Sequence, residues 1–296
     1  MKEMRIQQGE FKSVLTGNTI VAFYRTGTND RLVLQSCIEQ DEYKVAKILS
    51  GGPRDVAAQI KQLNSDTENL TCIDLGAHIG AFTLLMLDAG FKVTAVEPIP
   101  VNMELLQKNV QANGWDENCR CIFGAAGPGE GKKIHLVWGM PEGPARDQAL
   151  ERHRFIGGPG DLNSGREYGS DFKTYNIKEL LRGVAKCQIL KTDCEGGEVS
   201  ALDPTEENMR AVKKISAITG EIHVPRDEFP FLPAAATLFD DVTEELGLDP
   251  THYVLLKRKE KPCSEAKTTS KSRSKKSKMS NESAAQQGQE KRSSLQ

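Results

Sequence analysis

The chain has 296 residues, of which 38% are hydrophobic, and this is enough for one sizeable core with small additions. Its net charge of −2 is unevenly spread, because residues 261–296 contain nine Lys and Arg against three Glu, a net +6, which leaves −8 on residues 1–260. An acidic body argues against a core that binds nucleic acid through its phosphates. No apolar run approaches the roughly 20 residues of a membrane span, and the first residues lack the apolar stretch of a secretory signal.

The seven cysteines indicate a reduced, intracellular protein. Their number is odd, and most lie in runs typical of buried strands, where a free thiol is common. Cys119 and Cys121 are too close in sequence for a typical zinc pair, and no second pair accompanies them. We therefore expect no bound metal and a cytoplasmic location, with a nuclear location as the alternative that the basic tail allows.

Residues 1–50 are predicted to form an N-terminal cap. Short apolar runs there indicate strands or short helices at Thr19–Tyr24, Arg31–Ile38 and Tyr43–Leu49. The main domain is predicted over residues 51–260. It opens with a helix at Asp55–Leu63, whose apolar positions follow helical spacing.

From Leu70 onward, predicted strands and helices alternate regularly. Compact apolar runs predict strands at Thr71–Leu75, Lys92–Val96 and Cys119–Phe123. The segments between them have helical spacing and typical helix ends, which predicts helices at Ala81–Ala89 and Asn102–Ala112. This β-α-β-α-β order at short spacing predicts an α/β fold with a doubly wound, mostly parallel, Rossmann-like sheet.

The second half of the domain continues the alternation around one long insertion. Strands are predicted at Lys133–Trp138, Gln188–Thr192, Ile215–Ile222 and His252–Lys257, and helices at Ile177–Leu181 and Phe231–Leu246. Gly139–Gly169 is rich in Gly, Pro and charge, which predicts a loop insertion over residues 139–170. Residues 261–296 are rich in Ser, Lys and Gln and are predicted to be a disordered basic tail.

The cofactor site is predicted at the motif that joins the first regular strand to its helix. Asp74, Gly76 and Gly80 follow the spacing D-x-G-x-x-x-G instead of the G-x-G-x-x-G of dinucleotide folds. Asp74 would repel a pyrophosphate but favours a cation, and S-adenosylmethionine carries an ammonium and a sulfonium. Gly76 would let backbone and ligand approach closely, and Gly80 would let the helix begin tight against the strand. A dinucleotide oxidoreductase is accordingly disfavoured.

A second carboxylate supports the same cofactor. Glu97 ends the second strand, 21 residues after Gly76, where an acid in this fold accepts hydrogen bonds from ribose hydroxyls. The alternative is that Asp74 caps a turn and Glu97 is a solvated strand end. We interpret His78 as a loop residue beside the cofactor and not as a base. The other residues predicted at the cofactor are Ala77, Pro98 and Ala125, the last of which leaves room for adenine.

Five runs then carry more specific motifs: CIDLGAHIGAFT, AVEPIP, NMELLQKNVQANG, LKTDCEGGE and GEIH. Spanning about residues 70–225, they resemble the FkbM family of methyltransferases. The resemblance implies a class I methyltransferase fold with a seven-stranded sheet, S-adenosyl-L-methionine as donor, and O-methylation of a hydroxyl on a sugar or natural product. It implies cofactor-loop roles for Asp74, Gly76 and Gly80, ribose binding by Glu97, and a place for Asp193 and Glu195 at the polar end of the fourth strand.

Acidic and histidine residues near the strand ends are the candidates for catalysis, because ligands of an open α/β sheet bind there. Asp193 and Glu195 would share one face if their strand continues, and Glu221 and His223 would do the same. A hydroxyl nucleophile must lose its proton, so we predict His223 or Asp193 as the general base. Turn capping or cofactor contact by Asp193, and a structural histidine at 223, are the alternatives. Asp193, Glu195 and His223 would also suit a metal chemically, but no spacing signature supports one, and Glu198 is expected to begin the next helix.

The function predicted from these residues is S-adenosylmethionine-dependent methylation of a hydroxyl on a small-molecule or glycan acceptor. One alternative is a protein or RNA methyltransferase, in which nucleic acid or protein is recruited by the basic tail and not by the core. Another alternative is a non-catalytic protein that keeps the fold and binds the cofactor.

Overall fold

The computed structural model describes residues 5–50, 70–138 and 168–258, all of which belong to one compact unit, Met1–Arg258. The helix predicted at Asp55–Leu63, most of the predicted insertion and the predicted basic tail lie outside the described residues. None of the described helices combines the length and the apolar character that a membrane crossing requires.

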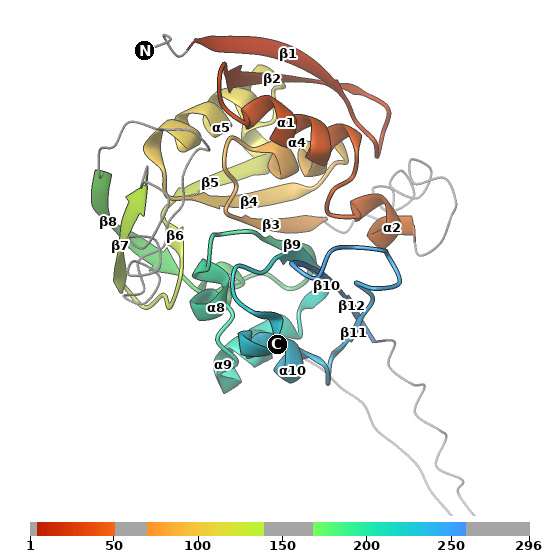
Figure 1. Ribbon diagram of the computed structural model, residues 1–296, viewed down its shortest axis with the longest axis vertical. Coiled ribbons are helices and arrows are strands. Elements are labelled where there is room, and N and C mark those ends of the chain that lie inside the picture. Colours follow the sequence, from red (N-terminus) through yellow and green to blue (C-terminus); the bar gives the residue numbers. More distant parts are fainter. Residues whose placement is uncertain (1–4, 51–69, 139–167, 259–296) are drawn as a thin grey trace, which may run out of the picture. The chain divides into compact units, whose positions relative to one another are not determined.

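A seven-stranded sheet forms the centre of the unit, in the order β11-β12-β10-β9-β3-β4-β5 (Figure 1). Neighbouring strands among β3, β4, β5, β9 and β10 pair in parallel, whereas β12 is antiparallel to β10 and β11 is antiparallel to β12. This confirms the predicted mostly parallel, doubly wound α/β fold. The strands are β3 (Thr71–Leu75), β4 (Lys92–Glu97), β5 (Cys119–Phe123), β9 (Cys187–Thr192), β10 (Ile215–Glu221), β11 (Phe239–Asp241) and β12 (His252–Lys257).

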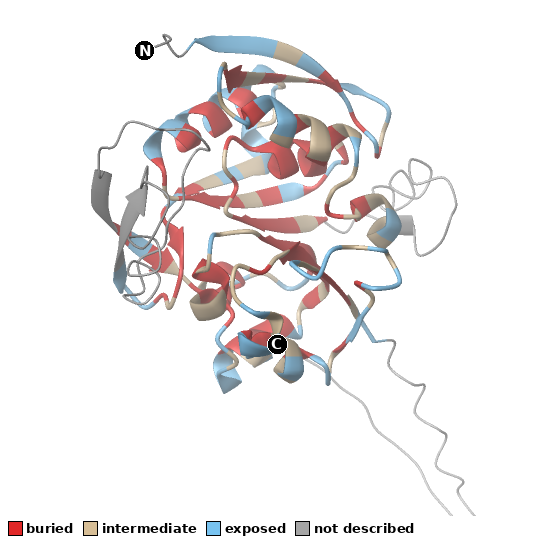
Figure 2. Cartoon of the chain, in the orientation of Figure 1, coloured by how far each residue is buried: buried red, intermediate tan, exposed pale blue. Residues whose placement is uncertain are grey.

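Each face of the sheet buries its own apolar core, because successive strand residues point to opposite faces. Cys72 joins one core and Ile73 the other, and Ile189 and Leu190 divide in the same way. The first core packs under α4 (Ala81–Asp88) and α5 (Pro100–Ala112). The second core packs against α7 (Ile177–Leu180), α8 (Gly197–Ala201), α9 (Glu206–Val212) and α10 (Phe231–Ala235). Figure 2 shows the buried residues concentrated in the central strands and the helices beside them.

The N-terminal segment shares the first core instead of forming one of its own. Its elements are β1 (Ile6–Lys12), β2 (Thr19–Arg25), α1 (Asp30–Leu34), the π-helical turn η1 (Gln35–Glu39) and α2 (Val45–Ser50). Two side-chain amides, Asn109 of α5 and the capping residue Asn113 just after it, bind the backbone of β2. Asn109 accepts from the Phe23 N–H at 2.6 Å, and Asn113 accepts from the Val21 N–H at 3.1 Å and donates to its carbonyl at 2.8 Å. Strand β1 is largely exposed and polar, which is why its sequence did not indicate a strand.

A second, three-stranded sheet has the order β6-β8-β7. Its strands are β6 (Ala125–Ala126), β7 (Lys133–Trp138) and β8 (Tyr168–Tyr175), which come between β5 and β9 in the sequence. The predicted loop over 139–170 is wrong at its end, because β8 begins at Tyr168 and pairs along the whole of β7. Two short 3-10 turns complete the described elements, η2 (Asp116–Asn118) and η3 (Arg226–Glu228).

The helix predicted at Phe231–Leu246 is also wrong. Helix α10 ends at Ala235, and the chain then forms β11, whose Phe239 is buried and paired with Lys257. The apolar spacing of this segment suits a helix locally. A continued helix would, however, leave the outer edge of β12 without the strand that satisfies its backbone groups.

Candidate active site

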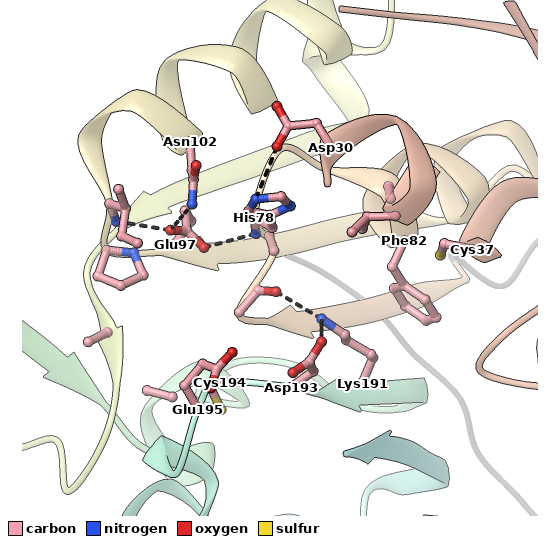
Figure 3. Close-up of a pocket in the computed structure, with 18 of the residues that line it drawn as sticks. Asp30, Cys37, His78, Phe82, Glu97, Asn102, Lys191, Asp193, Cys194 and Glu195 are labelled. Carbon is pink, nitrogen blue, oxygen red and sulfur yellow. Dashed lines mark hydrogen bonds and ion pairs between the residues drawn. The ribbon is translucent and has the colours of Figure 1, made fainter. Parts of the chain in front are cut away.

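A cavity of about 330 Å³ opens at the carboxyl ends of β3, β4 and β9, where ligands of this sheet type bind (Figure 3). The structure brings eight of the predicted site residues to its wall: Gly76, Ala77, His78, Glu97, Pro98, Ala125, Asp193 and Glu195. It also adds residues that the sequence did not indicate: Asn29, Asp30, Val33, Cys37, Tyr43, Ala81, Phe82, Ile99, Asn102, Ala126, Lys191 and Cys194. Asp74, Gly80 and His223 do not line it.

Glu97 is held rigidly at the end of β4. Its carboxylate accepts hydrogen bonds from the backbone N–H of His78 at 2.8 Å, from that of Ile99 at 3.0 Å, and from the side-chain amide of Asn102 at 3.1 Å (Figure 3). Burial raises the pKa of Glu97 in spite of these donors. The carboxylate is therefore oriented before any ligand arrives, with its remaining lone pairs available for hydroxyl donors.

Asn102 presents an unused acceptor at the same place. The residue is 2% exposed and lines the cavity, and its Oδ1 accepts no hydrogen bond from the part of the chain that the structure describes. A buried carbonyl oxygen without a donor is costly, because it has lost its hydration. A ligand with a polar N–H or O–H group in this cavity would relieve that cost.

Asp74 has a different environment from the predicted one. The residue is completely buried, and its carboxylate lies 3.2 Å from the ammonium of Lys191 and accepts a hydrogen bond from Thr83 at 2.7 Å. Lys191 also donates to the Gly76 carbonyl at 2.8 Å and lies 3.7 Å from Asp193. Burial opposes a charged lysine, but Asp74 and Asp193 raise the pKa of Lys191, so the ammonium stays charged. The sequence analysis did not single out Lys191, although a lysine inside an otherwise apolar strand is a signal that could have indicated it.

The two motif glycines serve close packing inside the protein. Gly76 has φ +77°, and a Cβ there would lie 1.8 Å from the carbonyl oxygen of Asp193. Gly80 has φ +96°, and its Cβ would lie 2.6 Å from Leu106 of α5. The close approach predicted at Gly76 is therefore to the end of β9, and the tight contact predicted at Gly80 is to a helix.

His78 connects the cofactor loop to the N-terminal segment. Its Nε2 lies 3.3 Å from the Arg25 guanidinium and 3.6 Å from Asp30, and these two residues form a buried ion pair with distances of 2.7 and 2.8 Å. Burial lowers the pKa of His78 to about 4, against the opposing charge of Asp30. His78 is thus a neutral residue of the cavity wall.

Asp193 and Glu195 reach the wall by a turn and not by strand alternation. Strand β9 ends at Thr192, and Glu195 and Gly196 have φ of +52° and +96°. The strand therefore does not continue, and the condition under which Asp193 and Glu195 would share one strand face is not met. Asp193 accepts a hydrogen bond from the Tyr43 hydroxyl at 2.8 Å. Burial opposes ionisation, but Lys191 and His223 lower the pKa of Asp193, which is a carboxylate at neutral pH.

His223 lies among four carboxylates just beyond β10. Its Nδ1 is 3.1 Å from Glu198, and its Nε2 is 3.5 Å from Asp193 and 3.8 Å from both Glu195 and Glu221. Burial would lower the pKa of His223, but the bond to Glu198 and the surrounding charges raise it to about 9. An imidazolium at neutral pH does not suit a general base. Glu198 lies in the first turn of α8, as predicted.

The comparison with protein families identifies the family of the chain, because the model of the methyltransferase FkbM domain matches residues 74–253. The chain belongs to the FkbM methyltransferase family. Its fold is the class I methyltransferase fold, and S-adenosyl-L-methionine is the cofactor that this family membership assigns to it. No protein among the curated sequences matches the chain.

Three solved structures with a similar fold are distant in sequence. They include the 16S rRNA methyltransferase RsmC of T. thermophilus in complex with AdoMet and guanosine (14% identity, 86% of this chain and 51% of that one, TM-score 0.39). Others are a human methyltransferase 10 domain containing protein (12%, 73% and 80%, 0.37) and the N-terminal domain of human METTL16 in complex with SAH (11%, 68% and 67%, 0.33). The chain spans about half the length of the first of these. The family assignment and the sheet order do not depend on these likenesses.

Proposed function

We propose that this FkbM methyltransferase methylates a hydroxyl group on a sugar, glycoconjugate or other small polyol, with Asp193 as the group that accepts the hydroxyl proton. The observation that carries the proposal is the position of Asp193. It lies on the wall of the cavity, 26% exposed, between the cationic Lys191 and the acidic group around His223.

The cavity residues fit S-adenosylmethionine in charge and in hydrogen-bonding capacity. Glu97 is oriented to accept from the two ribose hydroxyls, and the unused Oδ1 of Asn102 offers a further acceptor to the nucleoside. The wall carboxylates Glu97 and Glu195 suit a cationic ligand, whereas Asp30 and Asp193 already lie beside Arg25 and Lys191. When bound, the cofactor supplies an activated methyl group on a sulfonium.

Asp193 is placed to position a hydroxyl and to take up its proton. Its pKa is lowered, so it is a weak base towards a free alcohol, but it is a strong hydrogen-bond acceptor. As the hydroxyl oxygen receives the methyl group, its O–H proton becomes far more acidic than that of a carboxylic acid. A carboxylate is therefore a sufficient base when the proton leaves after the new bond to the methyl group has largely formed. The Tyr43 hydroxyl at 2.8 Å holds the carboxylate in place.

The acceptor class is inferred from the groups beside Asp193. Glu195, Glu221 and His223 lie together there, and ionised carboxylates accept hydrogen bonds from several hydroxyls at once. The same acidic surroundings disfavour a phosphate or a polyanion. A neutral, hydroxyl-rich acceptor suits this chemistry, and it agrees with the class of substrate that the family resemblance implies.

The test is methyl transfer from labelled S-adenosylmethionine by the full chain to a panel of glycosides, other polyols, proteins and RNA. We expect label on a small hydroxyl compound. Asp193→Asn should lower turnover by about 100-fold or more, since a positioned proton acceptor contributes on that order, while S-adenosylhomocysteine binding measured by calorimetry is retained. Label only on protein or RNA would contradict the proposed acceptor, and full activity of Asp193→Asn would contradict the role of Asp193.

A further inference from the structure

Three metal-ligating side chains converge next to the cofactor cavity, on its acidic side. One ligand atom from each of Asp193, Glu221 and His223 lies within 4.8 Å of the others. The Nε2 of His223 is 3.5 Å from Oδ1 of Asp193 and 3.8 Å from Oε2 of Glu221. All three are between 22% and 27% exposed, so solvent and small solutes can reach them.

Each of these side chains is oriented by a partner outside the set, and each partner leaves one ligand atom facing the common point. The buried Glu198 carboxylate contacts Nδ1 of His223 at 3.1 Å, which leaves Nε2 free. The Tyr43 hydroxyl donates to Oδ2 of Asp193 at 2.8 Å, which leaves Oδ1. His252 lies 3.2 Å from Oε1 of Glu221, which leaves Oε2. A carboxylate on the far nitrogen of a histidine is the usual outer-sphere support of a metal ligand.

The backbone brings these ligands together at the ends of two neighbouring strands. Glycine 220 on β10 pairs with Thr192 on β9, and a Cβ at Gly220 would lie 1.9 Å from the Thr192 carbonyl oxygen. This close pairing places Glu221 and His223 beside Asp193, which immediately follows Thr192. The arrangement is therefore built into the sheet and does not depend on a long loop.

We propose that Asp193, Glu221 and His223 bind a divalent cation of the Mn²⁺ or Mg²⁺ type. Two carboxylates and one imidazole are a donor set that such ions accept, and three protein ligands leave coordination positions for water or a substrate oxygen. Asp193 also lines the cofactor cavity, so the cation would lie at the boundary between cavity and acceptor. A cation there would hold the acceptor hydroxyl and make that hydroxyl more acidic, and this role rests on the proposed function. The binding of the cation does not rest on the proposed function.

A simple ion pair is the competing explanation for the same geometry. In that case His223 serves only as a positive charge among carboxylates, and no divalent ion binds. A neighbouring set, Glu42, Glu221 and His252, also has its ligand atoms within 4.8 Å of one another and shares one residue with the proposed site. The experiment must therefore distinguish a cation at the proposed site, a cation at the neighbouring set, and no bound cation.

The test is titration of the metal-free full chain with Mn²⁺, followed by electron paramagnetic resonance of the free ion. We expect one Mn²⁺ to bind. Glu221→Gln and His223→Asn should each weaken Mn²⁺ binding by about 100-fold or more, because the loss of an outer-sphere partner of a ligand already costs about 10- to 100-fold. Glu42→Gln is the matched control and should leave the affinity unchanged. Circular dichroism verifies that each variant is folded; should His223→Asn unfold, Asp193→Asn serves in its place.

Two results would overturn the site. One is the lack of saturable Mn²⁺ binding by the wild-type chain, and the other is binding that is lost in Glu42→Gln but kept in His223→Asn. Calorimetry with S-adenosylhomocysteine, run on the same metal-free protein, tests the proposed function independently. Loss of Mn²⁺ binding with retained S-adenosylhomocysteine binding rejects the cation site alone. Methyl transfer that continues unchanged in EDTA rejects the cation's role in the reaction.

Discussion

Gly76 and Asp193 are in such close contact that a Cβ on Gly76 would lie 1.8 Å from the Asp193 carbonyl oxygen. The contact joins the cofactor loop after β3 to the turn after β9, and the Asp193 N–H also donates to the Leu75 carbonyl at 3.0 Å. The cofactor loop is therefore in direct backbone contact with the residue proposed as the proton acceptor.

Gly76→Ala should destabilise the fold by about 3 kcal/mol, because it combines a positive φ with a backbone collision. Gly17→Ala is a matched control, since Gly17 has almost the same φ of +78° but nothing within 4 Å of its Cβ. That variant should lose only about 1 kcal/mol. Urea unfolding measures both free energies, and equal losses would show that the contact with Asp193 is not tight.

Glu97→Gln should weaken S-adenosylhomocysteine binding by about 100-fold, because it replaces a charged, doubly accepting group at the ribose position. The control is Glu104→Gln on α5, an exposed residue outside the cavity wall, which should bind as the wild type does. Isothermal calorimetry gives both affinities. Unchanged affinity in Glu97→Gln would place the ribose elsewhere.

Lys191→Met should destabilise the protein by about 3 kcal/mol, because it leaves Asp74 buried without its opposite charge. The second change Asp74→Asn should restore part of that loss, since the remaining group is then neutral. A double-mutant cycle from urea unfolding measures the coupling. Additive losses would mean that Lys191 and Asp74 do not interact.

His78 should make stability fall in mild acid. Its pKa is lowered from about 6.5 in the unfolded chain to about 4 in the folded protein, so between these values the unfolded state binds more protons. The stability that neutral His78 contributes to the fold is fully present above pH 6.5 and is lost as the pH falls towards 4. Wild type should therefore lose more stability than His78→Asn when urea unfolding is compared at pH 7.5 and 4.5. Asparagine suits the positive φ of +52° at this position and does not titrate. Parallel losses would contradict the assigned pKa.

The fold was largely predictable, because β3, β4, β5, β9 and β10 are compact apolar runs with clear turn signals at their ends. The elements that sequence reasoning missed depend on pairing between distant segments. Strand β11 forms because β12 offers an open edge, and local spacing in Phe231–Leu246 cannot reveal that edge.

The site residues that belong to a sequence motif were predictable, and those that reach the site through tertiary packing were not. Glu97 and Asp193 were found from their positions at strand ends, and both line the cavity. The contributions of Tyr43 and Asp30 come from the N-terminal segment, which shows no motif and reaches the cavity through tertiary contacts, among them its packing on α4 and α5. The raised pKa of His223 likewise arises from three carboxylates of other segments, Glu198 in α8 and Glu195 and Asp193 in the turn after β9.

The most direct test of the account is a crystal structure of the full chain with S-adenosylhomocysteine. It should show both ribose hydroxyls on the Glu97 carboxylate, a nucleoside group donating to Oδ1 of Asn102, and the ligand's sulfur on the side of the cavity that Asp193 lines. A nucleoside bound outside this cavity, with Glu97 and Asn102 making only the contacts they make within the protein, would contradict it.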